Sequence, residues 1–236
     1  YVDGTKGNDT NRGTCPDEAL KTLEEAYKKL AADAGNPDIT SSRGGIIYIV
    51  ANVDLTDTIT IKEDGDASVM TAGTNTYNTK GDVIIRRYSK PTKGKDGYTT
   101  ETNTETMFTI ADAANVSIQG VTIDGHSQKL DSTDDTLAAE GVTNADAIFS
   151  VKGKLTLGSG GAVTKNTLVQ NNDASDKNGG LIRIERTGNL CLTGDMPKEA
   201  DLEEGQAAVY GTRLSGGKAA NGNAVYADLG GTTEMK

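Results

Sequence analysis

LIRIERTGNLCLTG, residues 181–194, is the stretch that decides the fold. Ile182 and Ile184 alternate with polar neighbours, and a short polar turn leads into a second apolar run, NLCL. Apolar residues at every second position lie on one face of a strand. Three other stretches align with this one: MFTIADAANVSIQG (107–120), AIFSVKGKLTLGSG (147–160) and AVYADLGGTTEMK (224–236). The chain therefore repeats a strand–turn–strand unit.

The copies predict an all-β fold in which the chain coils. A third β-rich run often follows the second strand, as at 121–124, and residues 46–62 are a divergent first copy. Three strands per copy, stacked in parallel on the next copy, make a parallel β-helix. We expect about six turns over residues 46–236, within a single domain. Irregular spacing predicts polar insertions at 63–80, 88–106, 126–144 and 195–206.

Residues 1–45 are predicted to form a cap. An amphipathic helix is expected from about Cys15 to Ala34, with Thr14 as N-cap and Asp17 as its capping-box partner. An apolar stripe at helical spacing supports it: Leu20, Leu23, Tyr27 and Leu30. Such a helix would cover the strand edges of the first turn, which would otherwise pair with other chains. No comparable cap follows the last copy, so we expect the chain to be part of a longer protein.

Composition excludes several classes of function. With 24 Lys and Arg against 34 Asp and Glu, the net charge is −10, which disfavours nucleic acid as a partner. No apolar run is long enough to span a membrane. One His and two Cys exclude His-based metal clusters and four-cysteine zinc sites.

The first residues, YVDGTKGNDTNRGTCPDEALKTLEEAY, resemble the N-terminal cap of right-handed parallel β-helix proteins of the pectate-lyase-like superfamily. The match is carried by Gly7, Asp9, Gly13, Thr14, Pro16, Lys21, Thr22 and Leu23. NAVYADLGGTTEM, at 223–235, resembles repeats in adhesin-like surface proteins of Gram-positive bacteria. The resemblance implies a right-handed coil; activity does not follow, because this fold carries lyases, hydrolases, adhesins and stalks.

The resemblance also suggests where an active site would lie. Polysaccharide lyases of this fold use carboxylate-bound Ca²⁺ with a basic residue, and the related hydrolases use clustered Asp beside His. The candidates here are Asp124, His126 and Arg183, with Arg87 and Lys152 as further exposed bases on strands. The alternative is that Asp124-Gly125-His126 is a turn and Arg183 lies on a solvated face. The paired residues Asp134-Asp135 fall in an insertion.

The turn near the N-terminus offers oxygen ligands. Asp9 and Asn11 alternate ahead of Gly13, and Asp3 adds a carboxylate, which together suit Ca²⁺. The same residue types build turns without metal, and this alternative stays open.

We expect a non-enzymatic extracellular segment of a bacterial surface protein, adhesin-like or a structural stalk, and monomeric. Its partner would be a glycan or a host-surface protein, bound through the insertions or a lateral sheet face. No other cofactor is expected. The alternative is an enzyme, either a polysaccharide lyase or a glycoside hydrolase.

Overall fold

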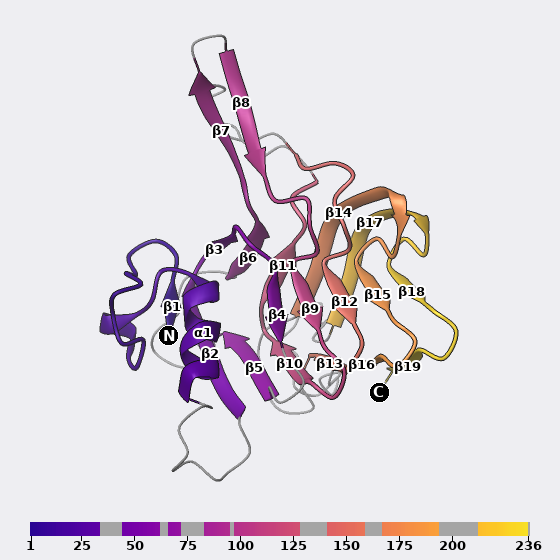
Figure 1. Ribbon diagram of the computed structural model, residues 1–236, viewed down its shortest axis with the longest axis horizontal. Helices are drawn as coiled ribbons and strands as arrows, with labels where there is room; N and C mark the ends of the chain where they lie inside the picture. Colours follow the sequence, from indigo (N-terminus) through magenta and orange to yellow (C-terminus); the bar gives the residue numbers. More distant parts are fainter. Residues whose placement is uncertain are drawn as a thin grey trace, which may run out of the picture.

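The computed structural model describes residues 1–33, 44–61, 66–71, 83–94, 97–127, 141–158, 167–193 and 212–235. Parallel β-sheet dominates these residues, beside a single α-helix (Figure 1). The predicted all-β class with parallel strands is therefore confirmed. No helix among the described residues is both long and apolar enough to cross a membrane.

Three parallel sheets contain most of the strands. The first sheet holds β1 (Val2–Asp3), β2 (Gly44–Ala51), β5 (Asp66–Thr71), β10 (Asn115–Gln119), β13 (Lys154–Leu157), β16 (Asn189–Leu192) and β19 (Thr232–Met235). The second holds β3 (Val53–Leu55), β6 (Ile84–Arg87), β11 (Thr122–Asp124), β14 (Thr167–Asn178) and β17 (Thr212–Asn221). The third holds β4 (Ile59–Ile61), β9 (Phe108–Ile110), β12 (Phe149–Val151), β15 (Ile182–Ile184) and β18 (Val225–Ala227).

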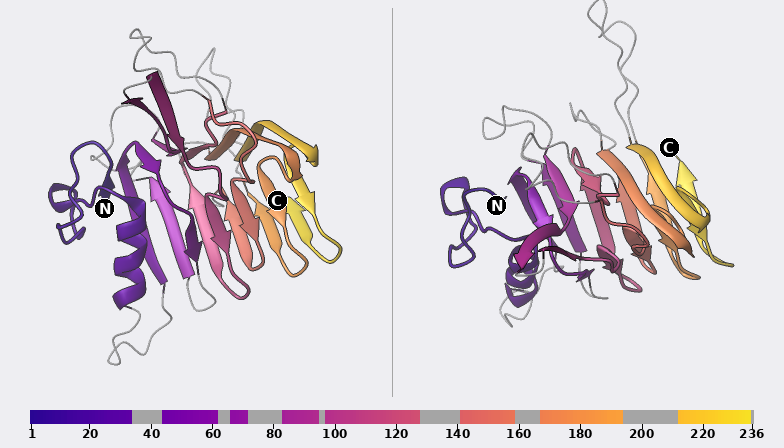
Figure 2. Two further views of the ribbon diagram at one scale, coloured as in Figure 1. Left: turned by 45° about the horizontal axis from the view of Figure 1, so that its top comes forward. Right: turned by 90° about the horizontal axis from the view of Figure 1, so that it is seen from above.

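From β2 onward the chain enters the first, second and third sheets in turn and then begins again. Figure 2 shows the resulting rows of strands, running from the N-terminal end of the molecule to the C-terminal end. Strands of successive copies pair in the structure: Val116 pairs with Leu155, and Leu155 with Leu190. The copy at 147–160 is offset by one residue from an ungapped alignment, since Phe149 rather than Ile148 pairs with Phe108. The repeat is therefore confirmed strand by strand, and the structure sets its register.

The core lies between the sheets. Inward-facing side chains at alternate strand positions are fully buried, among them Ile182, Ile184, Leu155 and Leu157. Phe108 and Phe149, on neighbouring strands of the third sheet, stack with ring centroids 5.1 Å apart. Burying each such side chain contributes about 1.5–3 kcal/mol to stability. The rows of β-branched and aliphatic side chains thus hold the copies together.

The cap helix begins later than predicted. A 3-10 turn, η1 (Pro16–Glu18), comes first, and α1 spans Leu23–Asp33. Between them Leu20 bridges to Val2, so this segment is extended and cannot continue a helix. The predicted N-cap at Thr14 is wrong: the hydroxyl of Thr22 accepts a hydrogen bond from the Glu25 amide at 3.3 Å and caps α1 instead.

Helix α1 packs on β2 and β3, at the N-terminal end of the sheets (Figure 2). Leu23 and Ala26 are buried, and Tyr27 and Leu30 pack partly buried against the same core. The Glu24 carboxylate accepts hydrogen bonds from the Thr56 amide at 3.1 Å and from the Thr56 hydroxyl at 3.2 Å. The helix is thus fastened to the connection that follows β3.

The insertions differ in part from the prediction. Strand β5 lies within the stretch 63–80, so that stretch is not wholly a loop. The insertion at 88–106 contains an antiparallel hairpin of β7 (Ser89–Gly94) and β8 (Gly97–Thr102), which projects from the sheets (Figure 1). The stretch 195–206 and the pair Asp134-Asp135 lie outside the described residues.

Candidate functional site

Insertions gather at the corner where the chain passes from the second sheet to the third. The hairpin β7–β8 leaves after β6, and residues 125–148 connect β11 to β12. Strands β14 and β17, of 12 and 10 residues, extend through the same corner. We name this region the insertion corner and define it by Arg87, Asn103, His126, Asp146 and Asn172. It is the candidate site.

Arg87 lies inside the insertion corner, with no exposed surface. It continues the inward face of β6 after Ile85, opposite the buried Leu55 of β3. This position corrects the expectation that Arg87 is an exposed base. Burial lowers the pKa of Arg87 to about 10, against the opposing effect of Asp146 and Glu105. The guanidinium is nonetheless charged at neutral pH.

The Arg87 guanidinium holds three segments together. It donates to the carbonyl oxygens of Asn103 at 3.2 Å, of Glu105, and of Asp146 at 2.9 Å. It also donates to Oδ1 of Asn172 at 3.0 Å. Asn172 is itself fully buried and donates to the carbonyl oxygens of Asp146 and Gly180. Three backbone carbonyl oxygens and one side-chain amide oxygen, rather than a carboxylate, therefore bind the buried cation, and its Nε has no hydrogen-bond partner among the described residues.

Gly125 leaves the space that this contact needs. It follows Asp124, which pairs with Arg86, so it lies beside Arg87 on the next strand. An added Cβ would lie 2.5 Å from Oδ1 of Asn172 and 2.8 Å from the Asn171 carbonyl oxygen. Asn171 has a positive φ of 54°, which bends β14. Because of this bend, Asn172 rather than Asn171 is the next buried residue after Val169. A glycine and a bend thus place the asparagine against the arginine.

Gly125→Ala is therefore expected to cost about 1–3 kcal/mol, because overpacking forces the buried Asn172 amide away from its partners. Thermal or denaturant unfolding measures the loss. In an Asn172→Gly background the same substitution should cost less, since both the Oδ1 and the Cβ that it meets are gone and only the Asn171 carbonyl oxygen remains close. Equal costs in both backgrounds would contradict this packing.

His126 lies within the insertion corner and not on an open surface. Its side chain is 3% exposed, and Nδ1 lies 3.0 Å from the carbonyl oxygen of Arg87. Its backbone has a φ of 58°, and its amide donates to Oδ1 of Asp124 at 2.8 Å. The other carboxylate oxygen of Asp124 accepts from Gln170 at 3.0 Å and from Asn171 at 3.3 Å. Asp124 and His126 therefore form a turn, as the alternative reading expects.

Arg183 lies apart from this pair, on the outward face of β15. Its Nε donates to Glu185 at 3.0 Å, and one terminal nitrogen lies 3.6 Å from Asp146. The Asp146 carboxylate also pairs with Lys177 at 3.4 Å. We name Lys177, Asp146, Arg183 and Glu185 the charged row. Within the described part of the chain, no hydrogen bond or ion pair joins Arg183 to Asp124 or His126.

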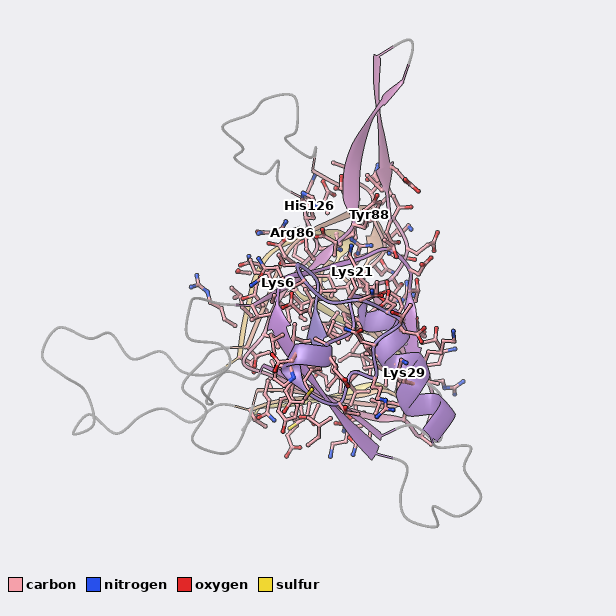
Figure 3. All side chains as sticks on the ribbon, turned by 90° about the vertical axis from the view of Figure 1, so that its left-hand side faces the viewer. Lys6, Lys21, Lys29, Arg86, Tyr88 and His126 are labelled. Atoms are coloured by element: carbon pink, nitrogen blue, oxygen red, sulfur yellow. The ribbon has the colours of Figure 1, made fainter. Side chains whose placement is uncertain are left out.

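The charged row meets the insertion corner at Asp146. Its backbone carbonyl accepts from Arg87 and Asn172, while its side chain faces Lys177 and Arg183. Glu185 further accepts from the hydroxyl of Ser150 at 3.0 Å. The row therefore presents alternating cations and carboxylates on a lateral face, held from beneath by a buried network. Figure 3, which views the molecule from its N-terminal end, shows Arg86, Tyr88 and His126 near the base of the hairpin.

The side chains expected as calcium ligands, Asp3, Asp9 and Asn11, form hydrogen bonds within the cap. Asp3 Oδ1 accepts from the amides of Thr5 and Lys6. Asp9 Oδ1 accepts from the amides of Lys21 and Thr22, and its Oδ2 accepts from the Thr22 hydroxyl. The Asn11 amide group donates to the carbonyl oxygen of Ala19 at 2.9 Å. Among the described residues, no group of three or more His, Cys, Asp or Glu could hold a metal ion.

Asp9→Ala is expected to cost about 1–3 kcal/mol, because it strips the acceptors from two backbone amides ahead of α1. The loss, measured by thermal unfolding, should be the same with Ca²⁺ and with EDTA, as a metal-free turn requires. A melting temperature of the unchanged chain that rises with Ca²⁺, and no longer does so in Asp9→Ala, would restore the calcium site.

No protein-family model, curated protein or solved structure matches the chain. The chemistry of the site therefore rests on its own geometry. Sequence reasoning missed Asn103, Asp146 and Asn172. The available signal was weak: an Asn-Asn-Asp run in β14 and an Asp directly before a strand.

Proposed function

We propose that this chain is a right-handed parallel β-helix from a bacterial surface protein, acting outside the cell as a non-enzymatic, adhesin-like or stalk segment. The observation that carries the proposal is the repeated passage of the chain through three parallel sheets. In this reading β2, β3 and β4 form one turn of the coil, and β16, β17 and β18 form another. Such a coil is a rigid, extended platform whose insertions are free to vary.

Binding is assigned to the insertion corner and the charged row. Arg183, Glu185, Asp146 and Lys177 offer hydrogen-bond donors and acceptors in alternation, and their side chains are between 20% and 41% exposed. Alternating donors and acceptors suit the hydroxyl groups of a glycan better than they suit a polyanion, which needs an excess of cations. A glycan, or a host-surface protein that presents comparable polar groups, is the proposed partner of a monomeric chain.

The candidate catalytic residues support a non-enzymatic role. His126 is buried and hydrogen-bonded to the backbone, and the charge of Arg183 is compensated by two carboxylates. General acid–base catalysis needs a base within reach of substrate and close to a charge stabiliser. Neither residue offers that combination.

The purified chain with Ca²⁺ is expected to release no unsaturated or reducing sugar from pectate, alginate, chondroitin or arabinan. On a glycan array it is expected to bind neutral, hydroxyl-rich glycans, and Arg183→Gln with Glu185→Gln should weaken that binding at least about tenfold. Arg213→Gln, an exposed position on β17, is the matched control and should bind normally. Binding that the double variant leaves intact would refute the charged row as the contact surface.

One observation favours the enzyme alternative. Arg183 lies within ion-pair distance of both Asp146 and Glu185, which places two carboxylates beside a basic residue on a lateral face. Turnover of any of the four polymers that is lost in both Arg183→Ala and Asp124→Asn would establish a lyase or glycoside hydrolase and overturn the adhesin proposal.

A further inference from the structure

The imidazole of His126 has one hydrogen-bonded nitrogen and one that is not. Nδ1 lies 3.0 Å from the Arg87 carbonyl oxygen, which can only accept, so Nδ1 carries the proton. In the neutral ring Nε2 then carries the lone pair. It is buried and has no hydrogen-bond partner among the described residues. The geometry therefore selects the neutral ring.

His126 joins the bases of two insertions. Its carbonyl oxygen accepts from the Val142 amide at 2.7 Å, and the neighbouring Ser127 amide donates to the carbonyl oxygen of Asn171 at 2.8 Å. Through Nδ1 it also contacts Arg87, whose guanidinium binds the carbonyl oxygens of Asn103 and Glu105 at the end of the hairpin. His126 thus joins the two attachment points, one through its backbone carbonyl oxygen and the other through its ring.

Burial, more than the surrounding charges, opposes a proton on His126. The charged side chains near it are Arg86 of β6, Asp124 of β11 and Asp54 of β3, and Arg87 contacts it through its carbonyl oxygen. Burial is the main cause that lowers the pKa of His126 below its ordinary value, and Arg86 acts in the same direction. The hydrogen bond to Arg87 and the carboxylates of Asp124 and Asp54 oppose the shift without reversing it.

We propose that His126 is an acid-sensitive latch: protonation of Nε2 loosens the insertion corner and frees the bases of both insertions while the coil stays folded. The added proton has no acceptor among the described residues at its buried position and adds a cation beside Arg86. Because the folded chain favours neutral His126, the contribution of this residue to the free energy of unfolding is complete above its pKa in the unfolded chain. The contribution is lost as the pH falls from that value through the lower pKa of the folded chain.

The first test uses the unchanged chain. Since the sequence has one His, its ring gives a single Hε1 resonance in a proton NMR spectrum. The resonance is expected to titrate with a midpoint below the ordinary value of about 6.5. Amides of Ser127 and Val142 should shift with the same midpoint. A midpoint at or above the ordinary value, or amides that do not follow it, would overturn the latch.

The second test compares His126→Asn with the unchanged chain by hydrogen exchange. Asn tolerates a positive φ and can donate to the Arg87 carbonyl oxygen, but it does not titrate. Peptides covering 127 and 142 should exchange alike in both proteins near pH 7.5, and faster in the unchanged chain near pH 5.5. The ratio of the exchange rates of the two proteins should change by up to about tenfold for each unit by which the pKa of His126 differs between the folded and the unfolded chain.

Because the two proteins are compared at the same pH, the intrinsic rate of amide exchange is the same in both and drops out of the rate ratio. The same comparison also cancels titration of the Tyr1 ammonium, whose pKa is lowered by burial and which both proteins share. Peptides from β13 and β16 report whether the coil itself opens, and their exchange should stay equal. Equal rate ratios at both pH values, or loss of protection across the whole coil, would contradict a local latch.

Discussion

Arg87→Met is expected to cost about 3–5 kcal/mol of the free energy of unfolding, the range seen when one member of a buried charged network is removed. Methionine fills much of the same space, so a cavity is not the main cause. The cost arises because the carbonyl oxygens of Asn103, Glu105 and Asp146 and the amide oxygen of Asn172 lose a charged donor. Urea unfolding at neutral pH measures it directly.

Two matched variants separate charge from packing. Arg87→Lys keeps the cation but cannot reach four acceptors from a planar group, so it should recover only part of the loss. Arg213→Met makes the parallel change at an exposed position of β17 and should stay within about 0.5 kcal/mol. If Arg87→Met were as mild as Arg213→Met, the guanidinium would not be what holds the insertion corner together.

The sequence predicted the fold class and the parallel stacking of the copies because the signal is local and repeated. Each copy alternates apolar and polar residues, and parallel stacking then sets Val116, Leu155 and Leu190 in one row. Insertions were harder to predict, since they obey no period. Strand β5 was not predicted because its residues, DASVMT, lie in a polar stretch and their apolar side chains, Ala67, Val69 and Met70, do not alternate strictly.

The insertion corner could be predicted only in part. Period-2 alternation after Val83 and Ile85 places Arg87 inward, but a charged residue there reads as exposed unless its partners are known. Those partners come from residues 103–105, 146 and 172, far along the chain. The inward position of Asn172 depends on the positive φ of Asn171, which its sequence neighbourhood does not reveal.

The start of the cap helix was missed for a related reason. Thr14 and Asp17 offer a sound local capping pattern, and Pro16 fits a first turn. The structure instead uses Asp9 to bind the amides of Lys21 and Thr22, and an extended Leu20 to reach Val2. Contacts across a turn outweighed a local preference of about 1 kcal/mol.

Leu23→Asp is expected to destabilise the chain by several kcal/mol and to cause self-association. Leu23 is 1% exposed and packs in the core beneath α1, so an ionised carboxylate there would be buried without a partner. A negative charge in the first turn of a helix gains about 0.3–1 kcal/mol from the helix dipole. That gain is too small to offset the burial, and the nearby Asp9 carboxylate adds repulsion.

Loss of the helix would uncover the packed face of β2 and β3, so soluble oligomers or aggregates should appear by size-exclusion chromatography together with a lower melting temperature. Leu229→Asp provides the control, because it is the same substitution at a residue that is 94% exposed. The control should elute and melt like the unchanged chain. Because the two variants carry the same added charge, a difference between them isolates burial under α1 as the cause. Identical behaviour of the two would show that α1 does not cover the core.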